Sequence, residues 1–148
     1  MDNKQKATII ANAMLKKANY DTGLGVKIIE ANEGYCKLSM QITDRMLNSH
    51  STCQGGVIFS FADCAFAYAC NSRNDIAVAY SVDITFINPV YSGDVLTASA
   101  KERHLRGRSG VYEVEVINHQ DEVVALFYGK SRSLQGKVVS EEELGEKS

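Results

Sequence analysis

The chain has 148 residues, 45% of them hydrophobic and 23% charged, which is typical of one globular domain with a substantial core. Its net charge of −2 argues against electrostatic binding of nucleic acid, so no nucleic-acid partner is expected. The N-terminal segment is polar and unlike a signal peptide, and the apolar run Gly55–Cys70 is too short for a membrane span. We therefore expect one cytoplasmic domain over residues 1–148, with no membrane partner.

The first predicted element is an amphipathic helix over residues 1–19. One face of this helix carries the apolar residues Ala7, Ile10, Ala11 and Met14. Residues 23–43 then predict two strands that turn at Asn32–Gly34, where the glycine suits a tight turn. Residues 44–50 read as a short irregular connection.

The next element is an apolar helix, Gly55–Cys70, whose length and alanine content favour helix over strand. Gly55 and Gly56 stand at its start, where the backbone can be approached closely. A single carboxylate, Asp63, interrupts the apolar run. Burying an unpaired carboxylate costs several kcal/mol or forces it to take up a proton, so Asp63 needs an explanation.

Beyond this helix the apolar residues recur with the period of a strand. Four strands are predicted, over residues 78–87, 94–104, 110–118 and 123–134. In the first of them, alternation places one set of residues together on one face: Val78, Tyr80, Val82, Ile84 and Phe86. Ser81 falls on the opposite face. Residues 136–148 are acidic and poor in large apolar side chains, and we expect a flexible tail there.

A helix that is apolar nearly all round must be covered on most sides, which predicts an α+β architecture with a curved antiparallel sheet of about six strands around it. Such a sheet leaves one side open, and a second subunit can close it. Asp63 would then lie in a crevice between two copies of the chain, within reach of a ligand.

The four cysteines, Cys36, Cys53, Cys64 and Cys70, have neither zinc-like spacing nor a secretory context. Reduced thiols are expected, and no metal site is predicted. A catalytic thiolate needs a histidine partner, and no histidine is placed for that role, so Cys53 and Cys64 are interpreted as small buried side chains.

Asn48, the run Gln54-Gly55-Gly56 and Asp63, at their spacing and on a helix of this composition, closely resemble the hotdog-fold acyl-CoA thioesterases of the phenylacetic-acid-degradation (PaaI) type. The resemblance covers nearly the whole chain, from Met14 to Leu134. It implies hydrolysis of an acyl-CoA thioester, with coenzyme A as part of the substrate and no further cofactor. It also implies a homodimer, paired again into a tetramer.

The resemblance also implies roles for individual residues. The Gly55 backbone N–H donates to the oxyanion, and Asp63 acts as general base or as nucleophile. Asn48 and Ser81 position the water or the carboxylate, with Asn48 and Gly55 of one subunit facing Asp63 and Ser81 of the other. The family usually has histidine where this chain has Gln54, whose amide donates a hydrogen bond but does not take up or release a proton as imidazole does.

Three arginines surround a predicted hairpin at residues 103–110. Arg106 and Arg108, on either side of Gly107, suit coenzyme A phosphates through their forked donors, and a solvated turn is the alternative reading.

Other readings stay open from the residues alone. Asp63 is also compatible with a structural role at a subunit seam, and Asn48 with a turn or helix cap. A non-catalytic acyl-CoA-binding protein is the alternative to an enzyme. An arylacetyl group such as phenylacetyl is the first choice of acyl group and a medium-chain acyl group the second. Five aromatic residues are candidates for the acyl pocket or for the core: Phe59, Phe61, Phe66, Tyr68 and Tyr80.

Overall fold

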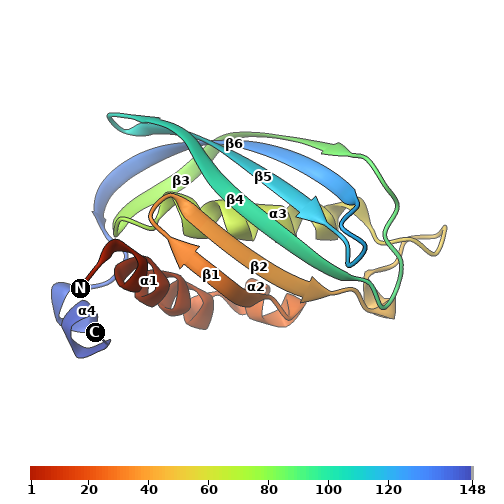
Figure 1. Cartoon of the computed structure of the whole chain (residues 1–148), viewed down its shortest axis with the longest axis horizontal. Helices are drawn as coiled ribbons and strands as arrows, with labels where there is room; N and C mark the ends of the chain where they lie inside the picture. Colours follow the sequence, from red (N-terminus) through yellow and green to blue (C-terminus); the bar gives the residue numbers. More distant parts are fainter. Residues whose placement is uncertain (148) are drawn as a thin grey trace.

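A six-stranded antiparallel sheet wraps around one long helix in the computed structural model, which describes residues 1–147 (Figure 1). The helices are α1 (Asn3–Lys17), α2 (Asn19–Leu24), α3 (Gly55–Cys70) and α4 (Glu141–Lys147), with a short 3-10 turn at Asp44–Met46. The strands are β1 (Lys27–Asn32), β2 (Tyr35–Gln41), β3 (Asp75–Phe86), β4 (Val95–Arg106), β5 (Ser109–Ile117) and β6 (Val123–Lys137). The predicted α+β architecture is confirmed.

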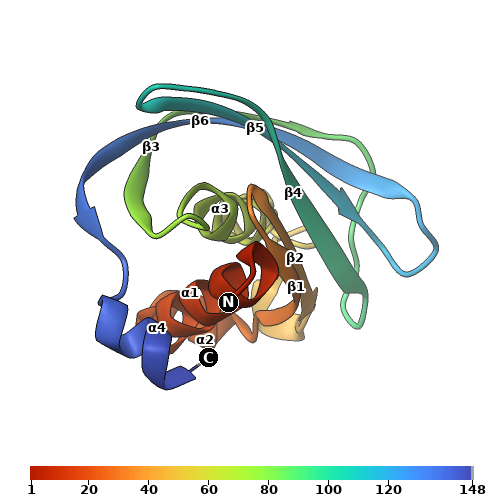
Figure 2. The ribbon, with the colours of Figure 1, turned by 60° about the vertical axis from the view of Figure 1, so that its left-hand side comes forward.

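The strand order across the sheet is β1-β2-β4-β5-β6-β3, so β1 and β3 are the two edges. In Figure 2 the sheet arches over α3, and α1 lies across the side that the sheet leaves open. Within residues 1–147, no helix is long and apolar enough to cross a membrane.

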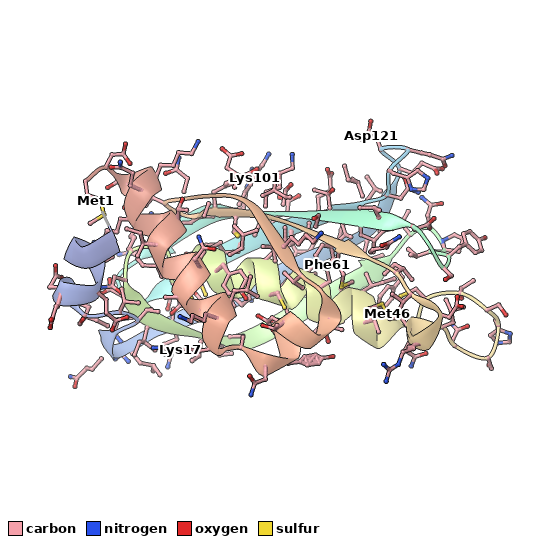
Figure 3. All side chains as sticks on the ribbon, turned by 90° about the horizontal axis from the view of Figure 1, so that it is seen from below. Met1, Lys17, Met46, Phe61, Lys101 and Asp121 are labelled. Atoms are coloured by element: carbon pink, nitrogen blue, oxygen red, sulfur yellow. The ribbon has the colours of Figure 1, made fainter. Side chains whose placement is uncertain are left out.

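The core lies between α3 and the concave face of the sheet, because α3 is apolar on most sides and must be covered. Figure 3, seen from the side of the helices, shows α1 in front and Phe61 enclosed in the centre. The Phe61 side chain is fully buried. On the predicted strands β4 and β5, period-two alternation turns small and branched side chains inward: Leu96, Ala98, Ala100, Val114 and Val116.

An aromatic group fixes the side chain of Phe66 against the sheet. Its ring lies 5.5 Å from that of Tyr112 and 5.7 Å from that of Phe127, measured between centroids. A Cβ on Gly129 of β6 would come within 2.7 Å of the Phe66 ring, so only glycine allows this close approach. Phe66 is therefore held rigidly on α3.

The edge strand β3 contains a bulge that the sequence pattern does not reveal. Ala79 pairs with Ser131 and Ser81 pairs with Lys130, so Tyr80 is an extra residue on β3. The predicted single apolar face is therefore wrong for the first half of the strand. Val82 and Ile84 pack against the core. Val78 pairs instead with the exposed Arg132, whose guanidinium lies 5.3 Å above the Tyr80 ring.

The N-terminal region forms two helices where one was predicted. Asp2 caps α1, and its side chain accepts a hydrogen bond from the Gln5 backbone N–H at 2.7 Å. The predicted apolar face is confirmed, since Ala7, Ile10 and Ala11 are buried.

The C-terminal residues differ from the expected flexible tail. Residues 136 and 137 complete β6, and Glu141–Lys147 form α4. Val139 and Leu144 are buried against α1, where they contact Ile10 and Ala13. The acidic composition concealed these apolar residues, whose burial against α1 stabilises the segment.

Candidate active site

Asp63 lies on the face of α3 that looks toward β3, in a pocket of about 480 Å³. The lining of this pocket is predominantly apolar and comes from α1, α3, β3 and the end of β6: Met14, Phe66, Ala67, Cys70, Asn71, Ile76, Ala77, Val78, Ala79, Lys137 and Val138. The Asp63 side chain is partly exposed and has no hydrogen-bond partner among the described residues. The carboxylate is therefore accessible to a ligand in the pocket.

The pKa of Asp63 is raised above the ordinary value for Asp, first because burial disfavours the charged form and second because Asp21 carries a negative charge nearby. Asp21 lies on α2, and Tyr68 of α3 donates a hydrogen bond to its Oδ2 at 2.5 Å. The nearby Asp21 carboxylate also helps to raise the pKa of the Cys64 thiol, after burial. The Tyr68 hydrogen bond holds the Asp21 carboxylate against α3.

Gly55 lies at the N-terminal end of α3, in a second pocket of about 300 Å³ that Thr52, Cys53 and Phe86 also line. The Gly55 backbone N–H has no partner among the described residues, as expected for the first turn of a helix. A Cβ on Gly55 would lie 3.2 Å from the Phe86 ring. The position thus offers a free backbone donor beside an aromatic wall, where the helix dipole favours negative charge.

One chain does not bring Gly55 and Asp63 together. Asp63 follows Gly55 by eight residues on α3, which separates them by about 12 Å along the helix axis. They line different pockets as well. A single thioester carbonyl cannot contact both groups in one protomer.

Asn48 organises the loop before α3. Its Oδ1 accepts hydrogen bonds from the backbone N–H of His50 at 2.9 Å and of Thr52 at 3.2 Å, and its Nδ2 donates to Thr52 Oγ1 at 3.0 Å. Ser51 within this loop has a φ of 63°, which the turn requires. The structure therefore gives Asn48 the turn role that the sequence left open as an alternative.

Gln54 is the residue immediately before α3. Its backbone N–H donates to the Met46 carbonyl at 2.8 Å, which fixes the start of the helix. Its side chain is exposed and makes no capping hydrogen bond. The amide is therefore free to contact a ligand at this end of α3.

Ser81 is not among the residues that line the Asp63 pocket, and its role in positioning the water or the carboxylate stays a prediction. The cross-strand partner of Ser81 is the exposed Lys130, whereas Ala79 pairs with the buried Ser131. Paired residues share a face of an antiparallel sheet, so the bulge at Tyr80 leaves Ala79 facing α3 and Ser81 facing outward. It is Ala79 that lines the Asp63 pocket.

The predicted hairpin around the arginines is confirmed. Arg106 pairs with Ser109, and Gly107 has a φ of 60°, which favours glycine in the two-residue turn. Arg108 Nε donates to the Ser133 carbonyl at 3.0 Å, while Arg106 is exposed with no partner among the described residues. The Arg106 guanidinium is thus available to an anion.

All four cysteines are free thiols, and burial raises the pKa of Cys53 to about 11 and that of Cys36 and Cys70 to about 12. None of them is a thiolate near neutral pH, which agrees with their interpretation as buried side chains. Within the described part of the chain, no cluster of His, Cys, Asp or Glu is arranged to hold a metal ion.

A family model described as "Thioesterase superfamily" matches residues 50–125, which include α3, Asp63 and the strands β3 to β5. The chain belongs to the thioesterase superfamily. It is 45% identical over 92% of its length to the acyl-coenzyme A thioesterase PaaI of Escherichia coli K12, of which it covers 97%. A putative esterase of Archaeoglobus fulgidus is 42% identical over 72% of this chain and 69% of its own.

Solved structures of PaaI proteins are similar to this chain as well. The structure of the E. coli PaaI protein, from the phenylacetic acid degradation operon, superposes with a TM-score of 0.91 at 44% identity, over 92% of this chain and 99% of that one. A variant of the phenylacetic acid degradation protein PaaI from Thermus thermophilus gives 0.76 at 32% identity, over 79% of this chain and 100% of its own. The predicted PaaI-type hotdog fold is confirmed.

The structure also shows residues that the sequence reading missed. Of the five aromatic candidates for the acyl pocket only Phe66 lines it; Phe61 and Tyr68 are buried, Phe59 packs on Phe127 and Tyr80 lies outside. Asp21 and Met14 reach the surroundings of Asp63 from the N-terminal helices. No motif connects these helices to α3, so only the tertiary fold reveals the contacts.

Proposed function

We propose that this protein hydrolyses acyl-CoA thioesters in a site that two copies of the chain build together. The observation that carries the proposal is the placement of a free backbone donor at Gly55 and an accessible carboxylate at Asp63, too far apart to act within one chain. The name of the E. coli relative, an acyl-coenzyme A thioesterase, supports the reaction class.

In this reaction Asp63 of one protomer removes a proton from water, and the water oxygen adds to the thioester carbon. The carbonyl electrons move to oxygen, and the Gly55 N–H of the partner stabilises the oxyanion. Collapse of this intermediate breaks the C–S bond and releases coenzyme A and the free acid. Direct attack by the Asp63 carboxylate, through an anhydride that water then cleaves, uses the same geometry.

The edge strand β3 is the surface through which a second copy would join. One side of β3 pairs with β6, and its other side presents unpaired backbone groups. Large apolar side chains are exposed there, among them Tyr80 and Phe86. Because Phe86 also covers Gly55, pairing at this edge would bring the α3 terminus of one copy toward the other. A homodimer, paired again into a tetramer, is the assembly that we propose.

The acyl-CoA substrate would place its phosphates at the hairpin, where Arg106 is free and Gly107 gives close access to the backbone. Its acyl group would enter the apolar pocket beside Asp63, whose aromatic wall is Phe66. An arylacetyl group such as phenylacetyl is therefore the proposed acyl class, ahead of a medium-chain group.

Subunit complementation tests the shared site directly. Asp63→Asn and Gly55→Pro variants should each be inactive with phenylacetyl-CoA when release of free thiol is followed with a thiol reagent. Unfolding and refolding the two together should restore activity, because a mixed dimer contains one intact pair of Asp63 and Gly55. Failure of the wild-type protein to release thiol from any acyl-CoA that it binds would instead identify a non-catalytic binding protein.

A further inference from the structure

Part of the lining of the pocket beside Asp63 comes from two segments at opposite ends of the chain. Met14 of α1 and Val138, just after β6, both line the pocket. The same two residues pack against the small apolar cluster in which Ile10 of α1 meets Leu144 of α4. We call α1, α4 and residues 138–140 the cap.

The cap is fixed to the rest of the fold by Asn74, which lies in the connection between α3 and β3. The buried Asn74 side chain accepts from the Val139 N–H and donates to the Val139 carbonyl, both at 2.9 Å. The Val138 N–H donates to the Asn74 backbone carbonyl at 3.1 Å. Three hydrogen bonds therefore hold the C-terminal part of the cap beside the pocket.

The neighbouring wall is equally well fixed. Asn71, at the end of α3, donates to the Ala77 carbonyl at 3.1 Å and accepts from the Ala77 N–H at 3.0 Å. Ala77 and Ala79 leave space in the pocket because their side chains are small. Phe66 opposite them cannot turn away, since Tyr112 and Phe127 enclose its ring. These contacts preform the wall of the pocket on both sides.

We propose that the cap limits the length of the acyl group beside Asp63, and that Met14 is the specificity-determining residue at its end. This inference rests on the proposed function, since it concerns the acyl group of the same thioester. The Met14 side chain fills this part of the pocket, so it leaves room for a ring or a short chain and takes the space that a longer chain would need. Shortening Met14 extends the pocket toward the apolar cluster between α1 and α4, where more methylene groups find apolar contacts.

The experiment measures kcat/KM for butyryl-, octanoyl- and dodecanoyl-CoA with wild type, Met14→Ala and Met14→Phe. Met14→Ala should raise the ratio of dodecanoyl to butyryl activity at least about tenfold, because each methylene in an apolar pocket contributes about that much to discrimination. Met14→Phe should lower the same ratio. Met46→Ala is the matched control, since Met46 is a partly buried methionine that lines a different pocket.

Binding of S-alkyl-CoA thioethers, which cannot be hydrolysed, separates the two proposals. Tighter binding of the dodecyl thioether by Met14→Ala than by wild type and by Met46→Ala supports the cap whether or not the protein is an enzyme. An unchanged length profile in folded Met14→Ala overturns the cap and leaves hydrolysis intact. Val138→Ala should shift the profile in the same direction and replaces Met14→Ala if that variant does not fold.

Discussion

The Tyr68 hydroxyl donates a hydrogen bond to Asp21 Oδ2 at 2.5 Å, and this contact joins α3 to the short N-terminal helix α2. Burial is the main reason why the pKa of Tyr68 is raised, and the hydrogen bond to Asp21 raises it further. The contact also keeps the charge of Asp21 close to Asp63, where it raises the pKa of the carboxyl that we propose to be catalytic. The short helix α2, in which the sequence shows no motif, thus affects the pKa of Asp63.

This relationship predicts the pH dependence. Because Asp63 must be ionised to act, kcat/KM should rise as the pH rises through its pKa, and the acid limb should lie above the ordinary range for Asp. Asp21→Asn removes the neighbouring negative charge and keeps an acceptor for Tyr68, so the limb should move to lower pH. The other charged group at the pocket, Lys137, is paired with Asp75 at 2.6 Å and stays unchanged.

The control for this measurement is Asp83→Asn, since Asp83 lies on the outward face of β3 opposite Tyr128. Its pH profile should match that of wild type. An Asp21→Asn profile that also coincides with wild type would show that Asp21 does not tune Asp63.

Asp63→Asn should lower kcat by at least about 10²-fold, within the range of general base catalysis, and leave the protein folded. The variant should also melt at a higher temperature than wild type at pH 7. Since the folded-state pKa of Asp63 is raised, ionisation costs stability above that pKa. The cost disappears as the pH falls below the unfolded-state pKa, so the two melting temperatures should converge in acid. A lower melting temperature with normal turnover would indicate a structural Asp.

Gly55→Pro tests the role of the Gly55 N–H as a donor, and Gly55→Ala tests whether the site needs the space that a side chain would fill. Proline is tolerated at the first position of a helix but has no N–H, so Gly55→Pro should lower kcat by about 10²- to 10³-fold. Gly55→Ala retains the N–H and brings its Cβ 3.2 Å from the Phe86 ring, a contact that a small ring movement relieves. In steady-state kinetics, kcat of Gly55→Ala should therefore be well above kcat of Gly55→Pro. Equal losses in both variants would leave no role for the N–H.

Gln54→His should retain or raise thioesterase activity, and Gln54→Ala should lower it, because the exposed amide next to the α3 terminus is free to orient the thioester. Initial rates with one acyl-CoA at saturation compare the three proteins. Identical rates in all three would show that the side chain at this position is passive.

Arg106→Ala should raise KM for acyl-CoA about three- to tenfold with little change in kcat, and added salt should reduce the difference. A thioester of pantetheine, which lacks the nucleotide phosphates, should not distinguish the variant from wild type. Arg103→Ala is the matched control, since Arg103 already faces Glu113 at 3.8 Å in the neighbouring strand. Equal KM changes with both thioesters would show that Arg106 does not bind the nucleotide phosphates.

The sequence predicted those parts of the fold in which local pattern and tertiary burial agree. The apolar run of α3 and the alternation on β4 and β5 gave the correct elements, and the spacing from Asn48 to Asp63 gave the family. The bulge at Tyr80 could not be predicted, because period-two alternation assumes an unbroken strand. That one extra residue is the reason why Ala79 shares a face of β3 with Val82 and Ile84 and lines the Asp63 pocket.

The cap was missed for a different reason. Val139 and Leu144 stand among acidic residues, and their burial depends on Ile10 and on Asn74, far away in the sequence. A short segment with few apolar residues looks flexible unless its partner is known. In the same way, nothing in the six residues of α2 indicated that Asp21 would face Tyr68.

The place of β3 in the sheet also sets the order in which a newly made chain can complete its fold. Within the described sheet the only neighbour of β3 is β6, and the contact between Asp75 and Lys137 joins residues that are 62 apart. As the ribosome releases the chain from its N-terminal end, α3 and β3 emerge long before β6, and the α3 face around Asp63 stays uncovered meanwhile. Synthesis that stops before β6 leaves β3 without its partner strand, so the β3 wall of the Asp63 pocket is set in place only when the last strand has been made.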